Sequence, residues 1–256
     1  MLRHGESVGN AAIRDAKAGL PTPPADDQQS SRRWLLNATG EKQAEATGAW
    51  MTENGLDRFD RYYCSPYVRT MQTAALLRLP DASWWLEPLV RERDRGYEYV
   101  ANRQEFAAAF PHSARGRKHD IFLWRATAGE SIADVDLRLR GFLSTLAREL
   151  DGKRVVCVTH EDAMDALRFR LEKMTIAEWI KHNERSVEPI SNAAVLHYSR
   201  RNPEDPLDVL ERFGWVRLVD PSGRGGFDWR PIVRRRFTNA ELLEMVTATG
   251  TQVAGP

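Results

Sequence analysis

A continuous apolar run, Val155-Val156-Cys157-Val158, leads directly into Thr159 and His160. A strand with one face in water alternates apolar and polar residues, whereas a run without alternation is typical of a strand covered on both faces. Such strands occur in parallel sheets that have helices packed on each side. The run therefore predicts a layered α/β fold, with His160 at the carboxyl end of a buried strand.

Segments with strand and helix patterns alternate along the chain on both sides of this run. We expect strands at 61–64, 84–86, 154–159 and 194–198. We expect helices at 39–54, directly after Ser65-Pro66, and at 132–150, 162–171 and 176–183. Ser131 is expected to cap the helix at 132–150, and Asp134 completes an approximate capping box. We predict an α/β fold with three layers, helix, sheet and helix, and a mostly parallel central sheet.

The length of 256 residues suits one domain with additions better than two domains. We assign residues 1–219 to this single domain. Residues 220–256 are interpreted as a C-terminal arm, rich in glycine, arginine and proline over 220–237, followed by a short helix at 239–246.

Three further segments are expected to decorate the domain. Residues 93–128 are interpreted as an insertion over the pocket, with a short helix at 104–110 and a basic patch formed by Arg115, Arg117 and Lys118. The polar residues 11–33 predict a long loop. A hairpin is expected across Phe213-Gly214-Trp215.

The nearly neutral net charge argues against partners that are bound through a strong overall electrostatic field. With a net charge of +1 and a pI near 7.8, neither nucleic acid nor an anionic membrane is expected as a partner. No apolar stretch reaches the roughly 20 residues of a membrane span. Cys64 and Cys157 lie in strand-like apolar runs, so we interpret them as buried thiols in a reducing compartment. We therefore expect a soluble, cytoplasmic protein.

Five short motifs carry the chemistry. The first is Arg3-His4-Gly5-Glu6, with Ser7 and Asn10 after it, and the others follow in the order Ser65-Pro66-Tyr67-Val68-Arg69-Thr70 with Gln72-Thr73-Ala74, Glu92 with Gly96, Gly129-Glu130-Ser131, and Thr159-His160-Glu161. Both His4 and His160 follow predicted strands directly. Because ligand crevices of parallel sheets lie beyond the carboxyl ends of strands, the two histidines are expected to converge.

These residue types suit phosphoryl transfer through a histidine. An imidazole can attack phosphorus when one ring nitrogen is unprotonated, and neighbouring positive charge lowers the pKa of His4 toward this neutral form. Arg3, Arg69 and a cationic His160 would place donors on the phosphoryl oxygens, where charge lies in the transition state. The chemistry requires no metal or other cofactor, and the remaining histidines have no paired ligand spacing.

In their order and spacing, the five motifs resemble the histidine phosphatase superfamily, also called phosphoglycerate mutase-like, over residues 2–198. The resemblance implies that His4 is the phosphorylated nucleophile and that Arg3, Arg69 and His160 form the phosphate pocket. It also implies that Asn10 is a further phosphate or substrate contact. Glu92 takes the place of the general acid in the family pattern Glu-x-x-x-Gly, so the catalytic set is His4, Glu92 and His160.

The family contains both hydrolases and mutases. Phosphoglycerate mutases continue after the acid with a Tyr-Gly-x-Leu-x-Gly type of stretch, whereas this chain continues Arg95-Gly96-Tyr97-Glu98-Tyr99. We therefore expect a phosphomonoester hydrolase that acts on a small phosphorylated substrate. A mutase and a non-catalytic phosphate-binding module are the alternatives. The oligomeric state is open, with a homodimer among the options.

Overall fold

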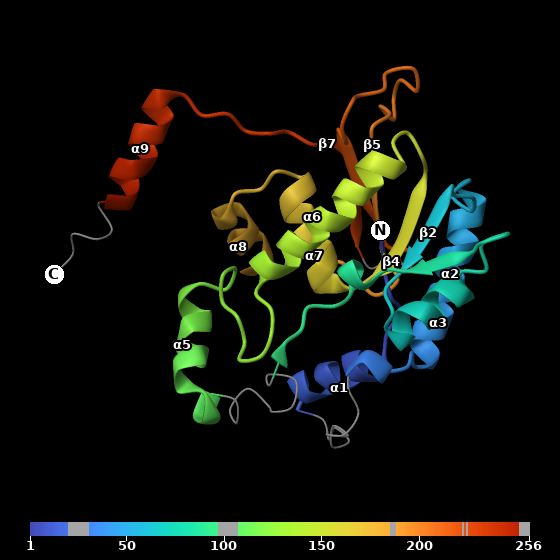
Figure 1. The fold of residues 1–256 in the computed structure, drawn as a ribbon, viewed down its shortest axis with the longest axis horizontal. Helices are drawn as coiled ribbons and strands as arrows, with labels where there is room; N and C mark the ends of the chain where they lie inside the picture. Colours follow the sequence, from blue (N-terminus) through green and yellow to red (C-terminus); the bar gives the residue numbers. More distant parts are fainter. Residues whose placement is uncertain (20–30, 97–106, 185–187, 222, 224, 251–256) are drawn as a thin grey trace.

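A seven-stranded sheet forms the centre of the described chain, in the order β3-β2-β4-β1-β5-β6-β7 (Figure 1). The structure is a computed structural model that describes all residues except 20–30, 97–106, 185–187, 222, 224 and 251–256. The strands are β1 (Leu2–Arg3), β2 (Arg61–Cys64), β3 (Trp84–Leu86), β4 (Val155–Thr159), β5 (Val195–Ser199), β6 (Trp215–Val219) and β7 (Gly226–Pro231). The helices are α1 (Val8–Lys17), η1 (Ser31–Arg33), α2 (Ala38–Glu53), α3 (Val68–Leu76), η2 (Pro88–Val90), α5 (Pro111–His119), α6 (Ile132–Glu149), α7 (Glu161–Leu171), α8 (Ile176–Glu184) and α9 (Asn239–Gly250).

The sheet is mixed, with a parallel half and an antiparallel half. Strands β3, β2, β4 and β1 pair in parallel, and β5, β6 and β7 are added in antiparallel orientation. The predicted α/β class is confirmed, and the parallel half contains the strands that the site motifs follow. The antiparallel half departs from a mostly parallel sheet, because these strands succeed one another in the chain without intervening crossover helices.

Helices cover both faces of the parallel half, as the apolar run of β4 predicts. Cys157 and Tyr63 point into a core shared with α6, α7 and α8, whereas Val156, Val158 and Tyr62 point into a core shared with α2 and α3. Figure 1 shows α6 and α7 on one side of these strands and α2 and α3 on the other. The period of two along a strand therefore divides its apolar side chains between two cores, which gives the three predicted layers.

The prediction of a loop from residue 11 was wrong for its first part, because α1 extends from Val8 to Lys17. Ser7 caps this helix: its hydroxyl accepts a hydrogen bond from the Asn10 amide at 3.2 Å, and the Asn10 side chain accepts from the Ser7 amide at 3.1 Å. This reciprocal capping satisfies amide groups at the helix start and stabilises a helix whose composition alone is polar. Residues 20–30 of the expected loop lie outside the described residues.

The long helix α6 is confirmed, including its capping box between Ser131 and Asp134. The insertion contains a helix that was not predicted, α5, which carries the basic residues Arg115, Arg117 and Lys118. Pro111 begins this helix, and Trp124 fixes it by donating from Nε1 to the Ser113 carbonyl at 2.7 Å. Of the helix expected at 104–110, residues 107–109 are helical and residues 104–106 lie outside the described residues.

The tail also differs from expectation. Residues 226–231 form β7, which pairs with β6, so they belong to the sheet and not to an irregular arm. The hairpin expected across Gly214 was wrong, because Gly214 only precedes β6 and the turn of the hairpin follows Val219. Beyond β7, the chain extends away from the body, and α9 is its last described element (Figure 1). Among the described helices, none has the length and apolar character needed to cross a membrane.

Candidate active site

The carboxyl ends of β1 and β4 bring the two motif histidines together. Arg3 lies opposite Thr159 in the parallel pair, and the His4 amide donates to the Thr159 carbonyl at 3.0 Å. His4 and His160 are therefore the next residues of two adjacent strands, and their ring centroids lie 5.2 Å apart. Both side chains are buried. The convergence follows from parallel pairing, since the ends of parallel strands meet at one edge of the sheet.

His4 has a fixed ring orientation. Its Nδ1 lies 2.7 Å from the Gly5 carbonyl oxygen, and its Nε2 lies 3.0 Å from Nε of Arg69. A carbonyl oxygen only accepts and a guanidinium only donates, so Nδ1 carries the proton and Nε2 carries a lone pair. Burial lowers the pKa of His4 well below its ordinary value, and the positive charges of Arg69 and Arg3 lower it further.

The guanidinium of Arg69 joins both imidazoles. While Nε donates to His4, a terminal nitrogen donates to Nδ1 of His160 at 3.1 Å, and the other donates to the Ser31 carbonyl at 2.7 Å. Arg69 is buried on α3, whose first turn follows the Ser65-Pro66 motif at the end of β2. A planar group with several fixed donors can span two rings in this way, which a lysine ammonium cannot.

His160 is neutral in this arrangement, which corrects the expectation of a cationic donor. Its Nδ1 accepts from Arg69, so its Nε2 carries the proton and donates to the Ser65 hydroxyl at 2.8 Å. Burial lowers the pKa of His160 well below its ordinary value, and the charge of Arg69 adds to the shift. A phosphate dianion beside the ring would act in the opposite direction, because opposite charge favours protonation.

Arg3 lies beside His4, and its two terminal nitrogens are both engaged. One terminal nitrogen donates to the Ile190 carbonyl, and the other pairs with the Glu161 carboxylate at 2.6 Å. Its Nε is buried and has no hydrogen-bond partner among the described atoms. Glu161 begins α7 directly after His160, so the sequence motif itself supplies the counter-charge of Arg3.

Glu92 lies next to His160, with Oε2 3.8 Å from Nδ1. Burial raises the pKa of Glu92 to about 7, and the negative charge of Asp162 contributes to the rise. Burial alone would raise the pKa of Asp162 as well, but Arg95, which donates to it at 2.8 Å, brings that pKa below its usual value. One carboxyl group is thus protonated near neutrality while its neighbour stays ionised.

Asn10 and Glu6, which also belong to the first motif, contact other parts of the chain. Asn10 lies on α1, and its carboxamide oxygen accepts from Ser7 and, at 3.3 Å, from Asn192. This oxygen is therefore occupied by capping, and a contact of Asn10 with phosphate stays a prediction. Glu6 accepts from Asn37 at 2.7 Å and pairs with Arg14, which ties the motif to α1 and to the start of α2.

Gly5 allows the turn after His4 to approach α2 closely. A Cβ atom on Gly5 would lie 2.3 Å from the carbonyl oxygen of Gly40, a distance that side-chain carbons do not adopt. The Gly5 amide donates to the Thr73 hydroxyl at 3.1 Å, and this hydroxyl donates to the Arg69 carbonyl at 2.7 Å. The backbone that orients His4 is therefore held by the same helix that carries Arg69.

The side chains of His4, Glu92 and His160 offer ligand atoms within 4.8 Å of one another, a spacing that a metal ion could bridge. The Arg69 guanidinium donates to both imidazoles, so its positive charge lies between the same groups. A cation placed there would be repelled, whereas an oxyanion would gain these donors. The arrangement therefore suits an anion better than a metal ion.

Sequence reasoning missed four residues that shape the site. Ser65 and Thr73 lie within the motifs, but no role was predicted for them. Both are buried, and their hydroxyl groups accept hydrogen bonds from His160 and from the Gly5 amide, respectively. Asp162 and Asn192 had no signal in the sequence. Asn192 donates to the His4 carbonyl at 3.1 Å from the segment before β5, a contact that only the pairing of β5 with β1 creates.

The comparisons with known proteins all indicate the same family. A model described as the histidine phosphatase superfamily (branch 1) matches residues 1–198. The 2,3-bisphosphoglycerate-dependent phosphoglycerate mutase of Rhizobium etli is 27% identical over 192 residues, which covers 70% of this chain and 81% of the relative.

Two other similar proteins are phosphatases by name. Human 6-phosphofructo-2-kinase/fructose-2,6-bisphosphatase 3 is 28% identical over 132 residues, covering 52% of this chain, and the match spans only 24% of that relative. The solved structure of mycobacterial glucosyl-3-phosphoglycerate phosphatase superposes with a TM-score of 0.59 at 20% identity, covering 86% of this chain and 95% of that one. At this identity the structural likeness shows a shared fold.

Proposed function

Because the chain belongs to the histidine phosphatase superfamily, we propose that it is a phosphomonoester hydrolase whose intermediate is a phosphohistidine at Nε2 of His4. Phosphatase and mutase activity both fit the family. The observation that carries the proposal is the tautomer of His4, with the Nδ1 proton held by Gly5 and the Nε2 lone pair directed at Arg69. A nucleophilic imidazole needs this form, and the lowered pKa of His4 maintains it at neutral pH.

In the first step, the Nε2 lone pair attacks phosphorus and the bond between phosphorus and the ester oxygen breaks. Arg69 and Arg3 supply positive charge where the phosphoryl oxygens gain negative charge. Glu92, with a pKa of about 7, gives its proton to the leaving oxygen. The products of this step are an alcohol, a Glu92 carboxylate and phosphorylated His4.

In the second step, water attacks the phosphorylated histidine. The Glu92 carboxylate accepts a proton from this water, the bond between Nε2 and phosphorus breaks, and inorganic phosphate leaves. His4 returns to its neutral tautomer and Glu92 to its acid form. Each residue thus reverses its role between the steps, as a group with a pKa near the working pH can do.

Water is favoured as acceptor because the residues after Glu92 lack the stretch that phosphoglycerate mutases carry there. A small phosphorylated metabolite is proposed as the substrate class. A mutase is the second candidate, supported by the Rhizobium etli relative, whose match covers 70% of this chain. A non-catalytic module is disfavoured, because Arg69 contacts both histidines and Glu92 lies 3.8 Å from His160.

Trapping the intermediate tests the proposal. The enzyme is mixed with an aryl phosphate labelled on phosphorus and quenched in alkali, and we expect an alkali-stable, acid-labile label on His4. His4→Ala should lose both label and phosphate release, while His112→Ala, altered on the outer helix α5, should keep both. Hydrolysis by His4→Ala at the parent rate would overturn the mechanism. Transfer between two positions of one substrate, without release of free phosphate, would favour the mutase.

A further inference from the structure

Helix α9 has an apolar face that no described part of its own chain covers. Leu242, Leu243 and Val246 are 48%, 70% and 69% exposed, and they lie on one side of the helix at three- and four-residue spacing. Thr238 and Glu241 cap the helix reciprocally, so its start is well defined. A helix of 12 residues is marginal in water without packing of its apolar face, so α9 requires a partner.

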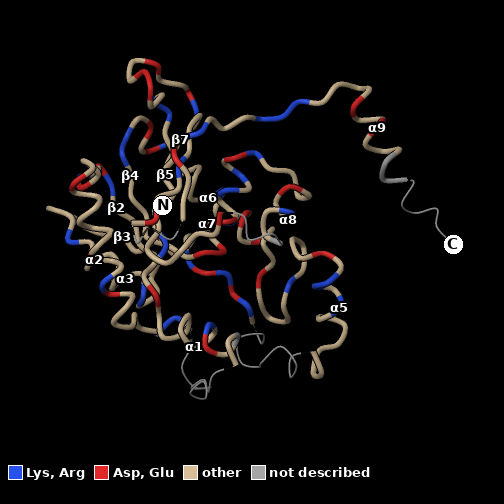
Figure 2. The backbone as a smooth tube through the Cα atoms, turned by 180° about the vertical axis from the view of Figure 1, so that it is seen from behind, with Lys and Arg blue, Asp and Glu red and all other residues tan. Residues whose placement is uncertain are grey.

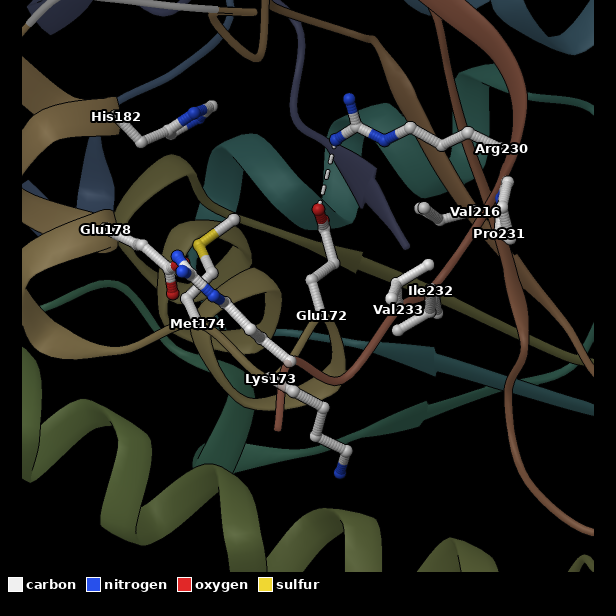
Figure 3. Close-up of a pocket in the computed structure, with 11 residues that line it drawn as sticks. Glu172, Lys173, Met174, Glu178, His182, Val216, Arg230, Pro231, Ile232 and Val233 are labelled. Atoms are coloured by element: carbon white, nitrogen blue, oxygen red, sulfur yellow. Dashed lines mark hydrogen bonds and ion pairs between the residues drawn. The ribbon is translucent and has the colours of Figure 1, made fainter. Parts of the chain in front are cut away.

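A matching groove lies where the chain leaves the sheet. A cavity of about 350 Å³ is lined by the apolar residues Met174, Ile232 and Val233 and by polar residues of both charges. Figure 3 shows Met174 on one side of Glu172 and Ile232 and Val233 on the other, and a dashed line joins the Glu172 carboxylate to Arg230. Ile176, at the start of α8 and two residues after Met174, adds a further exposed aliphatic side chain.

The charges of the helix and the groove are complementary. Helix α9 carries Glu241 and Glu244 and has no lysine or arginine. The groove is lined by Lys173, Arg230 and Arg235 and by the carboxylates of Glu172 and Glu178, so positive charge is in excess there. Lys173 forms no ion pair within the described part of the chain. Electrostatic complementarity of this kind selects between partners, so it favours α9 as the occupant of such a groove.

The connection between β7 and α9 does not return the helix to its own groove. Residues 232–238 contain neither glycine nor proline and form no turn, and Arg234, Arg235 and Arg236 follow one another in it. In both views this basic segment leads away from the sheet (Figures 1 and 2). Reversal within so few residues normally uses the turn residues that this segment lacks.

We propose that two copies of this chain exchange α9, so that the Leu242, Leu243 and Val246 face of each copy covers the Ile232 and Val233 groove of the other. The exchange is symmetric, because each copy supplies one helix and one groove, and the assembly closes as a dimer. The apolar contact supplies the stability that α9 lacks alone. This inference does not depend on the proposed reaction.

The mass of the full-length protein in solution is the first test. Light scattering after size exclusion should give twice the mass of the 29.2 kDa chain. Leu243→Asp combined with Val246→Asp should give a monomer with reduced helicity, whereas Leu207→Asp, at a site that is 91% exposed, should remain a dimer. A monomeric parent protein, or a double variant that keeps the dimer mass, would overturn the proposal.

Mixed single-cysteine variants distinguish exchange from other dimers. Val246→Cys and Val233→Cys are prepared separately, mixed and oxidised; the native Cys64 and Cys157 are buried and do not compete. Exchange predicts a disulfide-linked product that contains one chain of each variant. If the two cysteines join only when both are introduced into one chain, the helix folds back on its own groove and the proposal is wrong. If they join in neither case, the dimer uses another surface and the proposal is equally wrong.

Discussion

Nε of Arg69 donates to Nε2 of His4 at 3.0 Å, so the lone pair that would attack phosphorus is held by a guanidinium. Attack requires Nε2 to leave this hydrogen bond, and the released donor then lies where a phosphoryl oxygen can accept it. The same guanidinium donates to His160, which couples the orientation of both imidazoles to one residue of α3. In the proposed reaction, a single side chain would therefore both position the nucleophile and stabilise charge.

Replacing Arg69 with lysine tests this shared role. The substitution keeps a positive charge but loses the planar fork, so we expect kcat to fall about 10²–10³-fold, the usual effect of removing a positioned transition-state donor. Formation of the phosphoenzyme in a single turnover should slow in parallel. Arg58→Lys, in an exposed pair with Asp81, is the matched control and should leave both rates unchanged. A normal kcat in Arg69→Lys would contradict the assignment.

We predict that the pKa of Glu92, about 7, sets the alkaline limit of activity. A general acid must be protonated, so the rate should fall as pH rises through this value. Glu92→Gln should lower kcat for alkyl phosphates about 10²–10⁴-fold and abolish the alkaline limb. Aryl phosphates with acidic leaving groups need less protonation and should lose less. The exposed Glu53→Gln is the control, and equal losses for both substrate types would exclude Glu92 as the acid.

We expect the charge of Asp162 to influence the pH at which kcat falls on the alkaline side. Its negative charge raises the pKa of Glu92, and it also neutralises Arg95, whose charge lowers that pKa. In Asp162→Asn both effects lower the Glu92 pKa, so the alkaline limb of kcat should move to lower pH. Asp81→Asn, altered in an exposed ion pair, should not move it. A limb that stays in place or moves to higher pH would show that Asp162 has only a structural part.

Gly5→Ala is expected to cost stability at the site. The added methyl would meet the Gly40 carbonyl oxygen at 2.3 Å, and such overpacking typically costs about 1–3 kcal/mol in the free energy of unfolding. Gly141→Ala on α6 has room at 3.5 Å from Leu89 and should be neutral or stabilising, since alanine favours helices. Denaturant unfolding of both variants measures the difference. Equal stability would mean that the turn moves away from α2 without cost.

The helices and strands with strong local signals were predictable. The unbroken apolar character of Val155 to Val158 identifies a strand covered on both faces, and Ser131 with Asp134 marks the start of α6. Strand β7 had no such signal: Phe227 to Arg230 form a strand only because β6 offers a free edge beside them. Helix α1 was not predicted because residues 11–33 are mostly polar, and the helix start depends on the reciprocal capping between Ser7 and Asn10.

The amino-acid sequence by itself determined the α/β class and the approach of His4 to His160, because both histidines end strands and parallel strands end at one edge. Only the tertiary structure decided the protonation of the site. The neutral state of His160 and the raised pKa of Glu92 come from burial and from charges on Arg69 and Asp162, which different elements contribute. Desolvation and through-space charge depend on distances between segments far apart in the chain, and no local pattern of residues encodes those distances.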